Sequence, residues 1–235
     1  MKINKHVWLL LILPPIFFLF VTIAFSVFYS ISGVTDSNEI SSRITENIPW
    51  LILTVQLLML ALLVKLLHRE GQKIFDFGWI NGKKLNLLRE VLLGGAIGVG
   101  LGLAYIFWLS PLHVYLQTAF GDYVPAGQVL SGLGGSVIIF FLANILFAPF
   151  VEERLYRGYA LTRLTQKFGN RKAIIISSIF FGLLHWMGGF WYMILTGGVV
   201  GLLFGALAVK RGNIVLVFVA HLSLNIVEFL YIALR

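Results

Sequence analysis

The chain of 235 residues contains no cysteine and few charged residues. Without cysteine it has no disulfide, no thiolate metal site and no cysteine nucleophile. Charged residues make up 12% of the chain, about half of the roughly 25% found in an average soluble domain, whereas 59% of its residues are hydrophobic. So little charge does not cover the surface of a soluble globule, and the many aliphatic and aromatic residues exclude disorder. The composition therefore indicates an integral membrane protein.

The hydrophobic residues lie in continuous runs about twenty residues long, which is the length of a transmembrane helix. A transmembrane β-barrel would instead show segments of roughly ten residues that alternate between apolar and polar. We therefore predict an all-α polytopic bundle of about seven transmembrane helices. The expected spans cover about residues 7–31, 48–67, 87–109, 132–151, 173–186, 190–209 and 214–234. Pro111 is expected to stop the third helix.

Basic residues are concentrated in alternate loops of this arrangement. The net charge is +8, from 18 Lys and Arg against 10 Asp and Glu. All basic residues except Arg43 and Arg235 fall in the N-terminal segment or in loops on the same side, as cytoplasmic loops do. We therefore predict a cytoplasmic N-terminus. The placement of basic residues on one side of the membrane explains the positive net charge, and the sequence contains no nucleic-acid-binding motif. We therefore expect membrane lipid, and no nucleic acid, as a partner.

Nothing in the sequence divides the chain, so we predict a single membrane domain. Residues 1–130 would supply three N-terminal helices and residues 131–235 a four-helix core. Two of the spans carry glycine at every fourth position: Gly94, Gly98, Gly102, and Gly197, Gly201, Gly205. Such rows let helix backbones approach closely, and we expect them to pack helices within one bundle rather than to join two copies. The oligomeric state stays open.

Few polar side chains occur in the last four spans, and each needs a reason, because an ionisable residue inside a membrane costs roughly 2.5–3.5 kcal/mol. Glu152 and Glu153 are adjacent, so they point about 100° apart on a helix. Glu153 and Arg157 are spaced to form an ion pair, which would leave Glu152 free for another role. Alone, this cluster is better explained as the charged end of a helix.

Two histidines and an amide lie in the spans that follow. His185 sits in an otherwise apolar fifth helix, and alone it is compatible with a hydrogen-bonded core residue. His221 and Asn225 share one helix face, with Glu228 one turn further, and could simply form interhelical hydrogen bonds. Together with Glu152, however, these side chains supply the groups that activate a water molecule and stabilise an oxyanion.

Three short motifs thus follow one another on successive hydrophobic helices: Glu152-Glu153-x-x-x-Arg157, Phe181-x-x-x-His185 and His221-x-x-x-Asn225. Over about residues 138–229 the chain resembles the CAAX-protease and bacteriocin-processing (CPBP, or Abi) family, which includes the type II CAAX prenyl endopeptidases. The resemblance implies an intramembrane endopeptidase in which Glu152 and His185 activate the attacking water. It also implies that His221 and Asn225 stabilise the oxyanion. The remaining motif residues would support them: Glu153, Arg157, Phe181.

Alternatives remain for the mechanism and for the function. Glu152, His185 and His221 could hold a zinc ion, since two histidines and a carboxylate are a known catalytic zinc set. We favour a reaction without metal, because asparagine is a good oxyanion donor and a poor zinc ligand. The alternative function is a non-catalytic membrane regulator or scaffold of the same fold. A small proton-coupled transporter is disfavoured because the chain shows no inverted repeat.

The resemblance implies a membrane-associated peptide or protein as substrate, cleaved near the cytoplasmic face. Candidates are prenylated C-terminal tails, bacteriocin or pheromone precursors and signalling proteins. The compact chain suits a bacterial member of the family, and we expect it in the bacterial cell membrane.

The depth of the motif residues sets a condition on the fold. Glu152 lies near the end of its expected span, whereas His185 lies roughly 20 Å into its own at 1.5 Å per residue. They can meet only if the fourth helix continues through Arg157 or beyond. We then expect an amphipathic stretch over residues 155–168 near the cytoplasmic surface, and a cavity that opens toward the cytoplasm.

Overall fold

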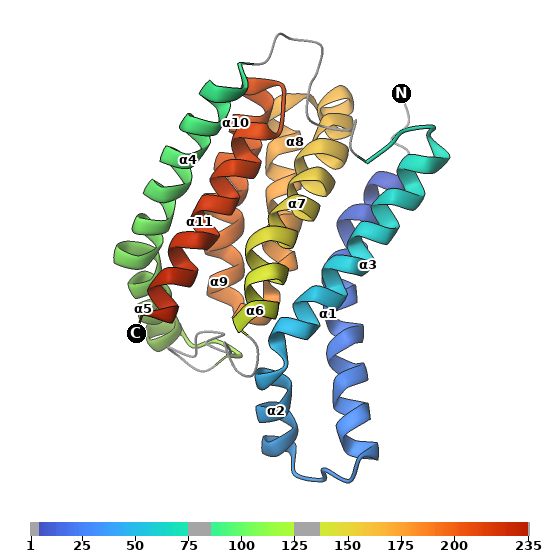
Figure 1. Cartoon of the computed structure of the whole chain (residues 1–235), viewed down its shortest axis with the longest axis vertical. Helices are drawn as coiled ribbons and strands as arrows, with labels where there is room; N and C mark the ends of the chain where they lie inside the picture. Colours follow the sequence, from blue (N-terminus) through green and yellow to red (C-terminus); the bar gives the residue numbers. More distant parts are fainter. Residues whose placement is uncertain (1–4, 75–85, 125–136, 235) are drawn as a thin grey trace.

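The computed structural model describes residues 5–74, 86–124 and 137–234, which are helical and contain no strand. The helices form a bundle in which α1 begins at one end and α11 ends at the other (Figure 1). In chain order the α-helices are α1 (Lys5–Ile31), α2 (Ser37–Glu46), α3 (Ile48–Arg69), α4 (Leu87–Ala104), α5 (Ser110–Phe120), α6 (Val137–Phe140), α7 (Ala148–Glu152), α8 (Thr162–Leu184), α9 (Phe190–Leu195), α10 (Leu202–Arg211) and α11 (Val215–Ala233). The all-α prediction is confirmed for these residues.

Five helical stretches are long and apolar enough to cross a membrane. They are Lys5–Ile31, Ile48–Arg69, Leu87–Phe120, Phe190–Arg211 and Val215–Ala233. The two other expected spans correspond to the helical run from Val137 to Leu161 and to α8, which together carry the Glu152 cluster and the basic residues around it. The expected start of the fourth span, from Gly132 to Ser136, lies outside the described residues, as does the expected domain boundary at residue 130. The count of seven spans therefore stays a prediction.

Pro111 does not stop the third helix, contrary to expectation, because that helix continues through α5 to Phe120. A five-residue π-helical segment, η1 (Tyr105–Leu109), directly precedes the proline. A proline lacks the N–H that would bond to the carbonyl four residues earlier, and its ring crowds that carbonyl. The wider π turn accommodates this conflict. Pro149 follows another π-helical segment, η2 (Phe141–Phe147), at the same distance.

The fourth helix continues past Arg157, as the depth of the motif residues required. α7 runs into the π-helical segment η3 (Glu153–Leu161) and then into α8, and the chain turns back at Gly169, which has φ 74° and ψ 167°. Only glycine adopts such a conformation readily. Glu152 lies 17 residues before this corner and His185 lies 16 residues after it. The two arms of the hairpin are therefore nearly equal, and both residues lie at the same depth.

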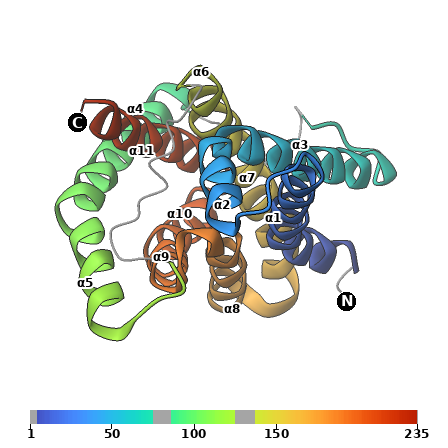
Figure 2. The same ribbon diagram turned by 90° about the horizontal axis from the view of Figure 1, so that it is seen from below.

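The first half of the stretch over residues 155–168 lies inside the bundle and not at its surface. Every residue of η3 is buried, and the segment packs against α1, α8 and α10. The large side chains Arg154, Tyr156 and Arg157 are almost completely enclosed. The expected position near the surface was therefore wrong for residues 155–161, whereas Gln166 and Lys167 in the second half are exposed. Figure 2 shows α7 and α8 with α1, α3 and α10 around them.

Both glycine rows pack helices within the bundle, as predicted. Gly94, Gly98 and Gly102 face α11, where a methyl group on Gly98 would lie 2.2 Å from the carbonyl oxygen of Ala220. In the second row, Gly197 and Gly201 face the backbone of α8 around Ser178. These close approaches leave no room for a side chain, so the rows fix how α4 lies on α11 and how the segment after α9 lies on α8.

Candidate active site

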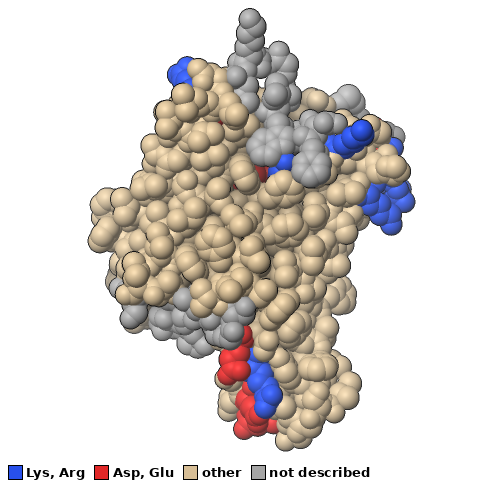
Figure 3. Space-filling view, in the orientation of Figure 1, with Lys and Arg blue, Asp and Glu red and all other residues tan. Residues whose placement is uncertain are grey.

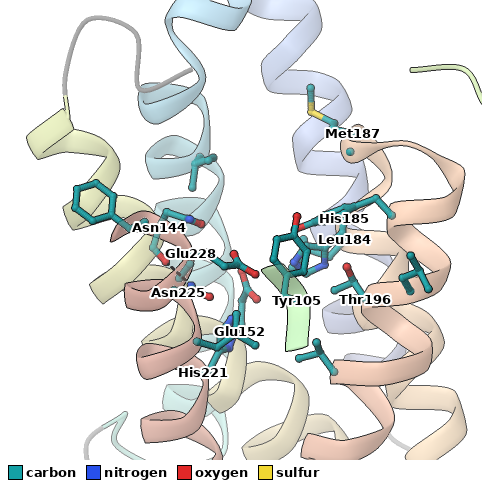
Figure 4. Close-up of a pocket in the computed structure, with 18 of the residues that line it drawn as sticks. Tyr105, Asn144, Glu152, Leu184, His185, Met187, Thr196, His221, Asn225 and Glu228 are labelled. Atoms are coloured by element: carbon teal, nitrogen blue, oxygen red, sulfur yellow. Dashed lines mark hydrogen bonds between the residues drawn. The ribbon is translucent and has the colours of Figure 1, made fainter. Parts of the chain in front are cut away.

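A cavity of about 400 Å³ lies inside the bundle and is lined by residues of α3, α5, α7, α8, α9 and α11. The four residues expected to be catalytic all line it: Glu152, His185, His221 and Asn225. Figure 4 shows Glu152, His221 and Asn225 on one side of the cavity and His185 on the other. The hairpin at Gly169 and the packing of α11 thus bring together side chains that are far apart in the sequence.

Glu152 is the buried carboxylate that remains available in the cavity. Only 4% of the residue is exposed. Its Oε1 accepts a hydrogen bond of 2.6 Å from Nε2 of Gln56 on α3, while its Oε2 has no hydrogen-bond partner among the described residues. One oxygen is therefore held in place and the other is free to accept a proton or a water molecule.

Glu153 points to a different set of partners. Its Oε1 accepts a hydrogen bond from Nη1 of Arg157 at 3.2 Å, which is the ion pair that the spacing predicted, and also lies 2.8 Å from Nδ1 of His221. Facing the Arg157 cation, Glu153 is a carboxylate and can only accept hydrogen bonds, so Nδ1 of His221 carries the proton. The guanidinium of Arg157 also stacks 4.0 Å from the ring centroid of Phe181. Glu153 therefore fixes the orientation of the His221 ring.

His185 lies at the end of α8, where the helix gives way to a short 3₁₀ turn, η4 (Trp186–Gly188). Its Nδ1 is 2.8 Å from the carbonyl oxygen of Phe181, one turn earlier. A carbonyl only accepts, so Nδ1 donates, and in the neutral ring Nε2 then keeps its lone pair. His185 can thus accept a proton in the cavity.

Asn225 lies one turn from His221 on α11. Its Nδ2 donates a hydrogen bond of 2.8 Å to the carbonyl oxygen of Asn144 in η2. Because an amide nitrogen carries two hydrogens, one of them remains for a ligand. This is the arrangement expected of an oxyanion donor that is fixed in place before the reaction begins.

All four π-helical segments of the described chain contact or supply the site. Tyr105 lies in η1, Asn144 in η2, Glu153 in η3 and Thr196 in η5 (Thr196–Gly201). π-helical turns are rare and occur often at functional sites, because the wider turn displaces a side chain from its regular position. The backbone around the cavity therefore contains π-helical turns in three separate helical runs.

Asp122 ties down the turn that follows His185. Its carboxylate accepts hydrogen bonds from the backbone N–H groups of Phe190 and Trp191, at 2.8 and 3.3 Å, which are otherwise unpaired at the start of α9. Burial acts to raise the pKa of Asp122, but these bonds and one from the N–H of Tyr123 outweigh it and hold the pKa below its ordinary value. The hydroxyl of Tyr123 donates to the carbonyl oxygen of Trp186, directly after His185. Two neighbouring residues therefore fix the position of this turn.

Among the described residues, no three His, Cys, Asp or Glu side chains come together as metal ligands. The zinc set considered from the sequence, Glu152, His185 and His221, is thus not assembled in this arrangement. The arrangement does not fit a zinc ion bound by all three residues.

The direction of the cavity differs from the one expected. Its lining extends from Glu152 toward Ser110, Met187 and Ile232, at the end of the bundle where α11 ends. Figure 3 shows that acidic side chains cluster at this end, on α2, whereas Lys and Arg gather at the opposite end. The expected opening faced the basic end, which the described lining does not reach. The reason lies in the hairpin, because both arms carry their site residues far from the corner at Gly169.

Comparison with known families agrees with this geometry. Residues 134–227 match the family described as type II CAAX prenyl endopeptidase Rce1-like. Over this segment, which is less than half of the chain, the protein matches the CAAX protease family. The match contains every motif residue of the site and supports a protease. No significant match to the chain was found among curated proteins or among solved structures.

The CAAX protease segment does not contain all the residues of the site. Gln56, which holds Glu152, lies on α3 and outside the family match, and so does Tyr105. The sequence carried a signal for Gln56, since it is an amide within an otherwise apolar span. It had no comparable signal for Tyr105, because tyrosine is common near the ends of membrane helices.

Proposed function

We propose that the chain is an intramembrane endopeptidase that hydrolyses a peptide bond of a membrane-associated substrate. The observation that carries this proposal is the free oxygen of Glu152 in a cavity that also contains His185. A water molecule between the two would lose a proton to one of them as its oxygen attacks the carbonyl carbon. The same proton then passes to the amide nitrogen, and the carbon–nitrogen bond breaks.

His221 and Asn225 supply the second part of the proposed reaction. The attack places a negative charge on the former carbonyl oxygen. The free N–H of Asn225 would stabilise that charge in a site of low polarity, and Nε2–H of His221 would do the same when that ring carries two protons. Their partners hold both side chains in place: the carbonyl oxygen of Asn144 accepts one of the two hydrogens on Nδ2 of Asn225, and Glu153 accepts from Nδ1 of His221.

We propose that the reaction proceeds without a metal. The separation of His185 from Glu152 and His221 across the cavity supports this proposal (Figure 4). The test is metal analysis of purified, active protein, followed by treatment with a zinc chelator. A stoichiometric zinc ion together with loss of activity on chelation would contradict the metal-free proposal and leave the peptidase proposal intact.

We propose a topology of seven crossings with the N-terminus in the cytoplasm of a bacterial cell. The segregation of basic and acidic side chains at the two ends of the bundle supports it (Figure 3). The family match suggests substrates such as lipid-modified C-terminal tails, and small secreted peptide precursors or membrane signalling proteins are the other candidates.

The test of the peptidase proposal compares cells that express the wild-type chain with cells that express Glu152→Gln or His185→Ala. New protein termini in the membrane fraction, identified by mass spectrometry, should appear with the wild-type chain and disappear with both variants. Glu39→Gln, on the exposed surface of α2, is the matched control and should retain them. If both site variants generate the same termini as the wild type, the mechanism is wrong. If Glu152→Gln also restores a deletion phenotype, the chain is a non-catalytic regulator.

A further inference from the structure

Glu228 is a carboxyl group in the cavity that the proposed reaction does not use. It lies on α11, three residues after Asn225, and lines the cavity. Within the described part of the chain it forms no hydrogen bond and no ion pair. An ionisable side chain placed in a membrane bundle without a partner is costly, and such residues generally have a function.

The cavity carries two carboxyl groups, and the basic side chains in its described lining are histidines. Glu152 and Glu228 line it, whereas no Lys or Arg belongs to its lining in the residues that the structure describes. The nearby Arg157 is paired with Glu153 and packed on the ring of Phe181. A ligand with a positive charge would therefore meet a favourable potential here, and an anion would not.

Aromatic rings accompany Glu228. Tyr105 of η1 and Tyr192 of α9 line the same cavity as Glu228. Figure 4 shows Tyr105 on the opposite side of the cavity from Glu228. The faces of aromatic rings attract cations, and the rest of the lining is mostly aliphatic and aromatic, which suits the alkyl stem of a basic side chain.

We propose that Glu228, Tyr105 and Tyr192 form a subsite for an alkylammonium or guanidinium group carried on an apolar stem. In a peptide substrate this group is the side chain of Lys or Arg. Because Glu228 lies about one helical turn from Asn225, the basic residue would be within a few residues of the scissile bond. The identification of this group as part of a peptide substrate rests on the proposed function. The proposal that the subsite binds a cation is independent of that function.

The experiment uses two photoreactive probes with the full-length protein in lipid nanodiscs at neutral pH. One is an alkylamine that carries a diazirine, and the other is the alcohol of the same chain length. Labelled residues are mapped by mass spectrometry. The amine should label cavity residues about tenfold more strongly than the alcohol does, as expected for a preference of ~1.4 kcal/mol. Equal labelling by the two probes would overturn the proposal.

Variants assign the preference to Glu228. Glu228→Gln should lose the preference for the amine while keeping the alcohol labelling, which also reports an intact cavity. Glu39→Gln should keep the preference. Persistence of the preference in Glu228→Gln, or its loss only in Glu152→Gln, would show that Glu228 is not the binding group. Labelling is measured without cleavage, so a protein that prefers the amine but cleaves nothing contradicts the peptidase proposal alone.

Discussion

Two adjacent glutamates have opposite surroundings in this protein, although their sequence context is nearly the same. Glu152 contacts a neutral amide and keeps one oxygen free, whereas Glu153 lies between a guanidinium and an imidazole. The angle of about 100° between successive side chains of a helix is enough to produce this difference. We therefore expect the two residues to respond differently to the same substitution.

Glu153→Gln should destabilise the fold, because Arg157 would be left as a buried and unpaired cation. Breaking a buried ion pair costs roughly 3–5 kcal/mol. Glu152→Gln removes no ion pair and should change stability by less than about 1 kcal/mol. Thermal unfolding in detergent measures both. Equal unfolding temperatures for the two variants would contradict this division of roles.

A double variant checks the cause. Replacing Glu153 by Leu together with Arg157 by Met removes both charges, and replacing a buried pair by apolar residues is often nearly neutral. The double variant should therefore unfold at a higher temperature than Glu153→Gln does. It should nevertheless be inactive, because His221 loses the group that orients it.

Gln56→Leu should lower kcat about tenfold, since the loss of one hydrogen bond to a charged group costs ~1.5–3 kcal/mol. KM should change little, because Gln56 holds the carboxylate rather than the substrate. The control is Thr54→Val on the same helix, which loses only a bond to its own backbone at Trp50. If Gln56→Leu raises KM and leaves kcat unchanged, Gln56 binds the substrate and does not position Glu152.

Two helix–helix contacts of the bundle, α4 with α11 and the segment after α9 with α8, depend on glycines that leave no room for a side chain. The packing of α4 on α11 is the clearest case, because the methyl group of an alanine at residue 98 would collide with backbone atoms, which cannot rotate away. Gly95 and Gly100 lie on the same helix with open space beside them. The same substitution thus has different consequences at neighbouring positions.

Gly98→Ala should lower stability by about 1–3 kcal/mol, as overpacking typically does. Gly95→Ala should be neutral or slightly stabilising, because alanine is the better helix former. Unfolding of the two variants in detergent measures the difference. A neutral Gly98→Ala would mean that α4 does not lie on α11 as described.

The turn between α8 and α9 depends on Asp122. The pKa of Asp122 is lower in the folded protein than in the unfolded chain. The ionised carboxylate therefore stabilises the fold fully above the unfolded pKa of about 3.9, and this stabilisation is lost as the pH falls through the lower pKa of the folded protein. Asp122→Asn should therefore destabilise the protein at neutral pH, and the difference from wild type should shrink as the pH falls below about 4. Unfolding temperatures measured from pH 7 to pH 3 test this, and a difference independent of pH would contradict it.

The hydrophobic pattern of the sequence predicted the presence of the long helices better than the residues at which they begin and end. Long apolar runs gave α1, α3 and α11 with small errors at the boundaries, and the motif spacing required the extension of the fourth helix past Arg157. The continuation of the third helix through Pro111 could not be predicted, because it depends on a π-helical turn that leaves no mark in the hydrophobic pattern. α2 was missed because it is short and polar.

At the scale of the whole molecule, the site is built from both halves of the chain. The motifs predicted Glu152, His185, His221 and Asn225, and the structure places all of them on one cavity. Gln56 reaches the same place from a helix without any motif. Its role follows from how α3 packs on the core, and no local pattern encodes that packing.

The absence of native cysteine allows each face of the molecule to be tested directly. Ser42→Cys on α2 and Ser110→Cys at the cavity should react with a membrane-impermeant maleimide from outside intact cells. Lys210→Cys at the basic end should react only in inverted vesicles. The reverse pattern would place the N-terminus outside, and a Ser110→Cys that reacts only in inverted vesicles would show that the cavity opens to the cytoplasm.

The equal arms of the hairpin impose a constraint on how this chain can change over evolution. A residue inserted between Glu152 and Gly169 would rotate Glu152 by about 100° relative to the corner and shift it by about 1.5 Å. The same holds for His185 on the other arm. An insertion in either arm therefore turns one of the two residues away from the cavity, whereas a change in the corner itself leaves both residues facing it.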